Sequence, residues 1–68
     1  MNRIKSERVG IGANREQFAS LLQVHPNTIQ NWENEDTDVP ASYLIRMRDI
    51  FGCSIDFLLG VSEYRNPM

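Results

Sequence analysis

The stretch NREQFASLLQVHPNTIQNWE, residues 14–33, decides the fold because it joins two short helical patterns through a tight connection. Asn14 and Gln17 form the pattern of a capping box, in which each side chain bonds the other residue's backbone N–H. Three apolar residues then share one helical face: Phe18, Leu21 and Leu22. We therefore predict a helix over residues 14–23.

A second helix follows a turn at residues 23–24. Pro26 suits the first position of a helix, where its missing N–H costs nothing. Ile29 and Trp32 are predicted to point inward. The polar residues left outside are uncharged: Asn27, Thr28, Gln30 and Asn31. The pattern predicts a helix over residues 26–34 with a row of amides on its exposed side.

The rest of the chain indicates three more helices and no alternating strand pattern. Their predicted ranges are 2–11, 41–51 and 55–60, with a polar, turn-rich loop at 34–40. Apolar residues expected to face inward on these helices are Ile4, Ile11, Leu44, Met47, Phe51, Ile55, Leu58 and Leu59. We predict an all-α domain over residues 1–61 and a short tail over 62–68.

Length and composition narrow the class of protein. A chain of 68 residues makes one domain with a small core, which dimerisation would help to stabilise. Cys53 is the single cysteine, so no internal disulfide forms, and its apolar neighbours indicate a small buried residue. The N-terminus has no apolar leader, and charged residues interrupt the most apolar stretch. We expect a cytoplasmic protein that does not span a membrane.

The charge is unevenly distributed. The net charge of −2 argues mildly against a nucleic-acid partner. Residues 1–32, however, hold four basic residues against two acidic ones, whereas residues 33–40 hold four acidic residues and no basic one. The basic part of the chain therefore surrounds the predicted exposed amides.

As a set, the motifs resemble the helix-turn-helix family of phage repressors and Cro-like proteins, also called Xre-like. They are IKSER at 4–8, Gly12, REQFA at 15–19, Leu22, Val24, TIQNWEN at 28–34 and FGCSIDFLLG at 51–60. The resemblance implies a five-helix, lambda-repressor-like fold whose second and third helices form the helix-turn-helix. It also implies a sequence-specific regulator of transcription, of repressor type, that binds double-stranded DNA as a homodimer.

The resemblance also assigns residues to the reading of bases. In the family, the first exposed residues of the third helix and one residue a turn later read the major groove, which here are Pro26, Asn27 and Asn31. Gln30 lies beside them. Asn and Gln pair well with adenine, because they donate and accept at once. Pro26 departs from the pattern, since it offers at most a contact to a thymine methyl.

Contacts to DNA phosphates are expected beside the base-reading residues. Arg15 stands where the family has a phosphate-anchoring glutamine, at a helix N-terminus that favours an anion. Thr28 and His25 are further candidates. The alternative for each is an ordinary solvated polar side chain.

One pair is expected to be structural. The resemblance pairs Arg8 with Glu33, which would tie the first helix to the third. The alternative is two separate solvated surface charges.

Two departures from the family bear on function. Gln23 stands where the family usually has glycine in the turn, and a non-glycine residue at positive φ is strained by about 1 kcal/mol. The loop after the third helix carries Glu35, Asp36 and Asp38 in place of basic residues. These carboxylates would repel phosphate unless the loop faces away from DNA.

The sequence gives little support for any other class of function. His25 is the single histidine and has no catalytic partner in a motif, and one Cys with one His cannot make a zinc site. The acidic loop lacks the spacing of a calcium loop. We expect no catalysis, metal, cofactor or small-molecule ligand. The remaining alternative is a helix-turn-helix that serves as a protein-interaction or dimerisation module with weak or no DNA binding.

Overall fold

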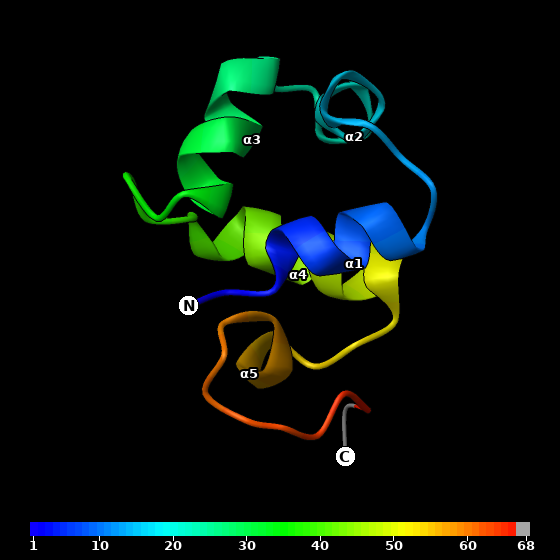
Figure 1. Ribbon diagram of the computed structural model, residues 1–68, viewed down its shortest axis with the longest axis vertical. Helices are drawn as coiled ribbons and strands as arrows, with labels where there is room; N and C mark the ends of the chain where they lie inside the picture. The colour runs from blue at the N-terminus through cyan, green and yellow to red at the C-terminus, as the bar shows by residue number, and fades with distance from the viewer. Residues whose placement is uncertain (67–68) are drawn as a thin grey trace.

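The computed structural model describes residues 1–66, and the regular structure in this part of the chain is entirely helical (Figure 1). The helices are α1 (Ile4–Gly10), α2 (Arg15–Leu22), α3 (Pro26–Glu33), α4 (Ala41–Phe51) and α5 (Ile55–Leu58). The prediction of an all-α, five-helix fold of the lambda-repressor type is confirmed.

Local signals explain where several helices begin. The Asn14 side chain accepts a hydrogen bond from the backbone N–H of Gln17, and the Gln17 side chain accepts one from Asn14, so the predicted capping box is confirmed. The Ser54 side chain caps α5 by accepting a hydrogen bond from the backbone N–H of Phe57. These bonds satisfy donors that the first turn of a helix leaves open.

The core lies where the helices meet. Its fully or almost fully buried residues are Ile4, Phe18, Ala19, Leu22, Ile29, Trp32, Met47, Phe51, Cys53 and Leu58. The rings of Phe18 and Phe51 stack with centroids 5.2 Å apart, which joins α2 to α4. Trp32 of α3 packs on Tyr43 of α4 at the same centroid distance. Burial of Cys53 agrees with the sequence prediction.

The arrangement leaves the helix-turn-helix at one end of the molecule. Figure 1 shows α2 and α3 at one end of the longest axis, α5 toward the other, and α1 and α4 between them. The loop after α3 projects at the end of that helix opposite the turn from α2. The two helices of the motif therefore rest on α1 and α4.

Three predictions of buried residues were wrong. Leu21 is 53% exposed, because the buried face of α2 is centred on Phe18, Ala19 and Leu22 and Leu21 lies about 100° off it. Ile11 and Leu59 are also exposed, since α1 ends at Gly10 and α5 ends at Leu58. Each of these two residues follows the last helical residue and leaves the inward face.

The described part of the predicted tail lies against the chain's own helices. Ser54 N–H donates to the Arg65 carbonyl at 2.7 Å, and the Arg65 guanidinium donates to the Phe51 carbonyl at 2.7 Å and to Glu7 at 2.7 Å. The last two residues of the predicted tail lie outside the described range. Among the described helices, none has both the length and the apolar character that crossing a membrane requires.

Candidate nucleic-acid interface

Helix α3 has one buried and one exposed side. Ile29 is fully buried and Trp32 is 4% exposed. The amide side chains expected to read bases stand on the exposed side: Asn27, Gln30 and Asn31. Packing of two large apolar residues fixes the rotation of a helix about its axis, because any other rotation would expose them. The three amides are therefore directed to solvent by the core itself.

The N-terminus of α3 is fixed by two local features. The Nδ1 atom of His25 accepts a hydrogen bond from the backbone N–H of Asn27 at 3.1 Å, so His25 is the N-cap. Accepting at Nδ1 places the proton of the neutral ring on Nε2, which can donate to another group. Pro26 occupies the first helical position, and Pro26 and Thr28 are half-buried. Both features act within the chain to define where α3 begins.

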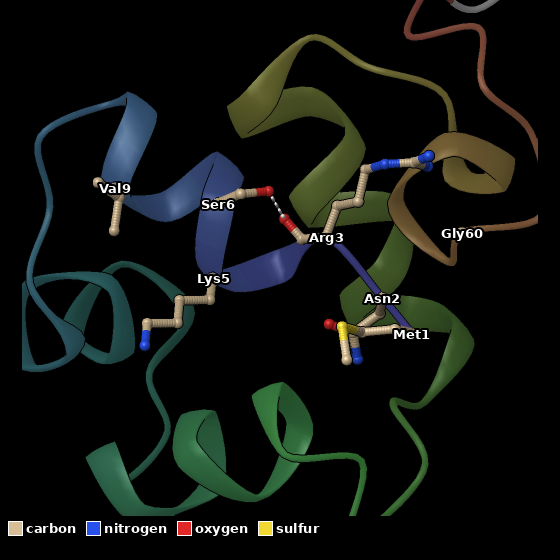
Figure 2. Close-up of a pocket in the computed structure, with 7 residues that line it drawn as sticks. All are labelled: Met1, Asn2, Arg3, Lys5, Ser6, Val9 and Gly60. Atoms are coloured by element: carbon tan, nitrogen blue, oxygen red, sulfur yellow. Dashed lines mark hydrogen bonds between the residues drawn. The ribbon is translucent and has the colours of Figure 1, made fainter.

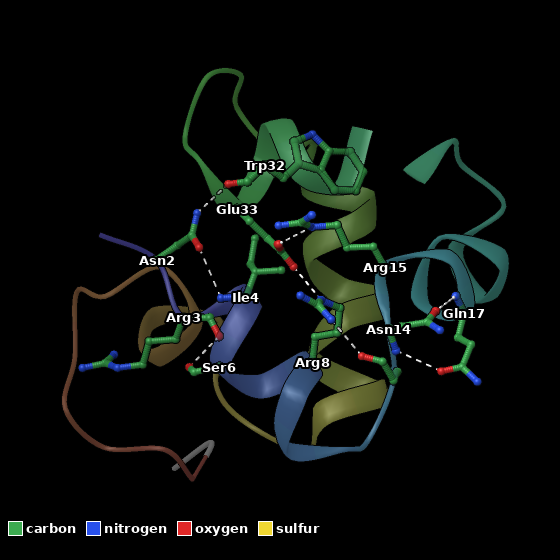
Figure 3. A network of polar contacts seen from close by, with 11 residues as sticks. Asn2, Arg3, Ile4, Ser6, Arg8, Asn14, Arg15, Gln17, Trp32 and Glu33 are labelled. Carbon is green, nitrogen blue, oxygen red and sulfur yellow. Dashed lines mark hydrogen bonds and ion pairs between the residues drawn. The ribbon is translucent and has the colours of Figure 1, made fainter. Parts of the chain in front are cut away.

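A buried carboxylate connects α3 to α1 and α2 (Figure 3). Glu33 Oε2 accepts from Arg8 Nε at 2.7 Å, and Glu33 Oε1 accepts from Arg15 Nε at 3.1 Å. Arg8 also donates from Nη1 to the Ala13 carbonyl at 2.9 Å. The structure therefore brings together Arg8 and Glu33, the two residues expected to pair, and adds Arg15 to them.

The burial of these groups separates their roles. The Glu33 side chain is 1% exposed and that of Arg8 is 9% exposed, whereas that of Arg15 is 40% exposed. A buried carboxylate is stable only when paired, so Glu33 depends on its two arginines. Arg15 alone of the three has a large part of its side chain at the surface. It remains accessible to a phosphate while it is bonded to Glu33.

The turn between α2 and α3 passes through Gln23 in the left-handed region, with φ of 57°. The family resemblance predicted this strain, because the family usually has glycine at this position. The sequence did not indicate the support given by Arg46 of α4, which donates to the Leu21 carbonyl at 2.9 Å and to the Leu22 carbonyl at 3.2 Å. These carbonyls belong to the last turn of α2, where no helical partner exists. Arg46 therefore holds the end of α2 from outside the motif.

The acidic loop lies away from the turn of the motif. Glu35, Asp36 and Asp38 are exposed and follow the C-terminal end of α3. Asn27 stands in the first turn of this eight-residue helix, which is about 12 Å long. The carboxylates are thus separated from the first amide by most of the length of α3, although they are closer to Asn31.

One surface hollow lies beside the N-terminal segment and not beside the exposed amides (Figure 2). It is lined by residues 1–3, Lys5, Ser6, Val9 and Gly60. None of these carries a carboxylate, imidazole or thiol side chain. Within residues 1–66, no group of three or more His, Cys, Asp or Glu side chains is arranged to hold a metal ion.

Cys53 is placed as a core residue. Its thiol pKa is raised, first by burial and second by the negative charge of Glu7. A raised pKa keeps the thiol protonated and unreactive near neutral pH. Cys53 therefore contributes packing to the fold.

The comparisons with known proteins agree with this geometry. A family model described as "Helix-turn-helix" matches residues 4–58 of the chain. The chain is also similar to the HTH-type transcriptional regulator ImmR of Bacillus subtilis (strain 168), with 28% identity over 61 residues. That alignment covers 90% of this chain and 48% of ImmR, so the chain spans about half the length of this curated relative. No solved structure gives a significant match.

Proposed function

Because the chain belongs to the helix-turn-helix family whose model it matches over residues 4–58, we propose that it binds double-stranded DNA and regulates transcription. In this proposal it is a sequence-specific repressor of the Cro and phage-repressor type, with α3 in the major groove. The observation that carries the proposal is the exposed row of amides opposite Ile29 and Trp32. A major groove of about 12 Å admits one α-helix.

The amides of α3 are proposed to read the bases. Asn27, Gln30 and Asn31 are exposed and uncharged, and an Asn or Gln side chain can bond adenine at N6 and N7 together. Pro26 precedes them and supplies an apolar contact, such as one to a thymine methyl. The sequence preference would therefore come from two or three amides and favour adenine.

Three residues are proposed to bind phosphate. Arg15 offers a guanidinium at the first position of α2, where the helix dipole also favours an anion. His25 can donate from Nε2 while Nδ1 caps α3. Thr28 offers a hydroxyl in the first turn of α3. With so few cationic groups, the affinity for DNA should fall only gently with salt.

A homodimer is part of the proposal. Two copies related by a two-fold axis would place their α3 helices in successive major grooves, about 34 Å apart. We assign the DNA-binding unit to residues 1–61 and the tail to residues 62–68.

A second function is favoured by specific observations. The net charge is −2, and three carboxylates stand exposed after α3. Repulsion between these groups and phosphate would weaken DNA binding. A domain with these charges could instead serve as a protein-interaction or dimerisation module.

Selection of bound duplexes from a random library, followed by sequencing, tests the proposal. Enrichment of a palindromic sequence is expected, and Asn27→Ala should change the enriched bases at one position of each half-site. Asn34→Ala is the matched control, because Asn34 is an exposed amide that lies beyond the last residue of α3. No enrichment at low salt would contradict the proposal and favour the interaction module.

A further inference from the structure

Glu33 is positioned to control an exposed side chain as well as a buried one. Its carboxylate accepts one bond from each of two arginines through their Nε atoms, at 2.7 Å from Arg8 and 3.1 Å from Arg15. The Arg8 side chain is 9% exposed, but the Arg15 side chain is 40% exposed. The buried end of the network therefore fixes a guanidinium that reaches the surface.

The bond through Nε leaves the outer part of Arg15 for another acceptor. A guanidinium is a rigid planar fork with five N–H donors. The hydrogen bond from Arg15 to Glu33 is donated by Nε. With Nε held against Glu33, the two terminal amino groups still offer the outer edge of the guanidinium, where two parallel donors in its plane match a phosphate.

The surroundings of Arg15 suit an anion on balance. A polar surface hollow is lined by Arg8, Asn14, Arg15 and Glu16. Asn14 is the N-cap of α2, so the hollow lies at the positive end of that helix. Glu16 opposes an anion, but it is exposed and its charge is screened by water and salt.

We propose that Glu33 is a positioning residue for DNA binding, which holds Arg15 with its terminal amino groups presented to a backbone phosphate. The inference rests on the proposed function, since it concerns how the same surface binds DNA. A guanidinium that is already oriented loses less conformational freedom when the phosphate arrives. The geometry favours arginine at this position, because the donors that a lysine keeps when bonded to Glu33 sit on a single rotating ammonium and form no fixed parallel pair.

The test compares Arg15→Lys and Arg15→Met with the wild-type chain on a random-sequence 20-base-pair duplex. Arg48→Lys is the matched control, since Arg48 is 44% exposed, bonds Asp49 through Nε at 3.2 Å and lies on α4. Binding is measured by fluorescence anisotropy from 50 to 200 mM salt, at a temperature where melting curves show each variant folded. Each lost phosphate contact lowers the slope of log affinity against log salt concentration by about 0.9. The ratio of wild-type to variant affinity should therefore fall by about 3.5-fold between 50 and 200 mM salt.

Equal losses for Arg15→Lys and Arg15→Met, with no loss for Arg48→Lys, would support the proposal. Wild-type binding by Arg15→Lys would overturn it, because a positive charge without orientation would then be enough. Wild-type binding by Arg15→Met would overturn it as well, by showing that Arg15 does not contact DNA. If the wild-type chain binds neither this duplex nor any selected one, the proposed function itself fails and this inference fails with it.

Discussion

Replacing Arg8 with alanine should destabilise the domain by about 3 kcal/mol. Removing one partner of a buried ion pair costs about 3–5 kcal/mol, because the other charge remains buried. Glu33 would keep its bond to Arg15, which places the loss at the lower end of that range. The bond from Arg8 to the Ala13 carbonyl is lost too and adds about 1 kcal/mol at most.

This loss is large for so small a chain. At about 0.05–0.15 kcal/mol per residue, a domain of 68 residues has a free energy of unfolding of about 3–10 kcal/mol. A loss of 3 kcal/mol should lower the melting temperature by about 12–24 °C. Urea denaturation followed by the fluorescence of Trp32, the single tryptophan, measures the change directly.

Lys5→Ala is the control, because Lys5 is an exposed cation on the same helix and its loss should change stability by less than about 0.5 kcal/mol. The double variant Arg8→Met with Glu33→Leu should lose less than Arg8→Met alone, since it leaves no buried carboxylate. If Arg8→Ala and Lys5→Ala unfold within about 1 kcal/mol of each other, the network does not hold the domain together as argued.

Three further results are expected. Asn31→Ala should weaken binding to a selected duplex by about 1–3 kcal/mol and relax the preference at one base pair, whereas a uniform loss over all sequences would assign Asn31 to phosphate. Gln23→Gly should raise the urea midpoint, by up to about 1 kcal/mol in stability, because glycine adopts the φ of 57° without strain; an unchanged or lower midpoint would contradict this. Since the folded state raises the thiol pKa of Cys53 above its ordinary value of 9.0, stability from this group is complete below pH 9 and is lost as the pH rises above it. Wild type should therefore lose more stability than Cys53→Ala between pH 8 and pH 10.5 in the same urea assay, and parallel curves would exclude a role for the thiol.

The features that could be predicted from the sequence are those whose partners lie within one or two helical turns. Asn14 and Gln17 are three residues apart, and Ile29 and Trp32 show the inward face of α3 by their spacing alone. Leu21 shows the limit of such patterns, because an apolar residue at an acceptable spacing faces solvent when the neighbouring helices do not cover it.

Contacts between distant residues left no local signal. Arg46 lies 24 and 25 residues from the two carbonyls that it bonds. Pairing of Arg8 with Glu33 was expected from the family resemblance, and the third member, Arg15, was not expected at all. A carboxylate with two acceptor oxygens can hold two arginines, but only the packing of three helices determines which ones come within reach.

The bonds from Arg46 bear on whether the motif can be transplanted. Residues 14–33 read as a self-contained unit, yet the last turn of α2 is closed by a side chain from α4. Glu33, at the other end of the motif, receives one of its two bonds from α1. If this segment were moved into another scaffold, the Leu21 and Leu22 carbonyls at one end would lose their donor. At the other end, one oxygen of the Glu33 carboxylate would lose its donor as well. A successful transplant therefore needs the segment together with arginines in the new scaffold that replace Arg8 and Arg46.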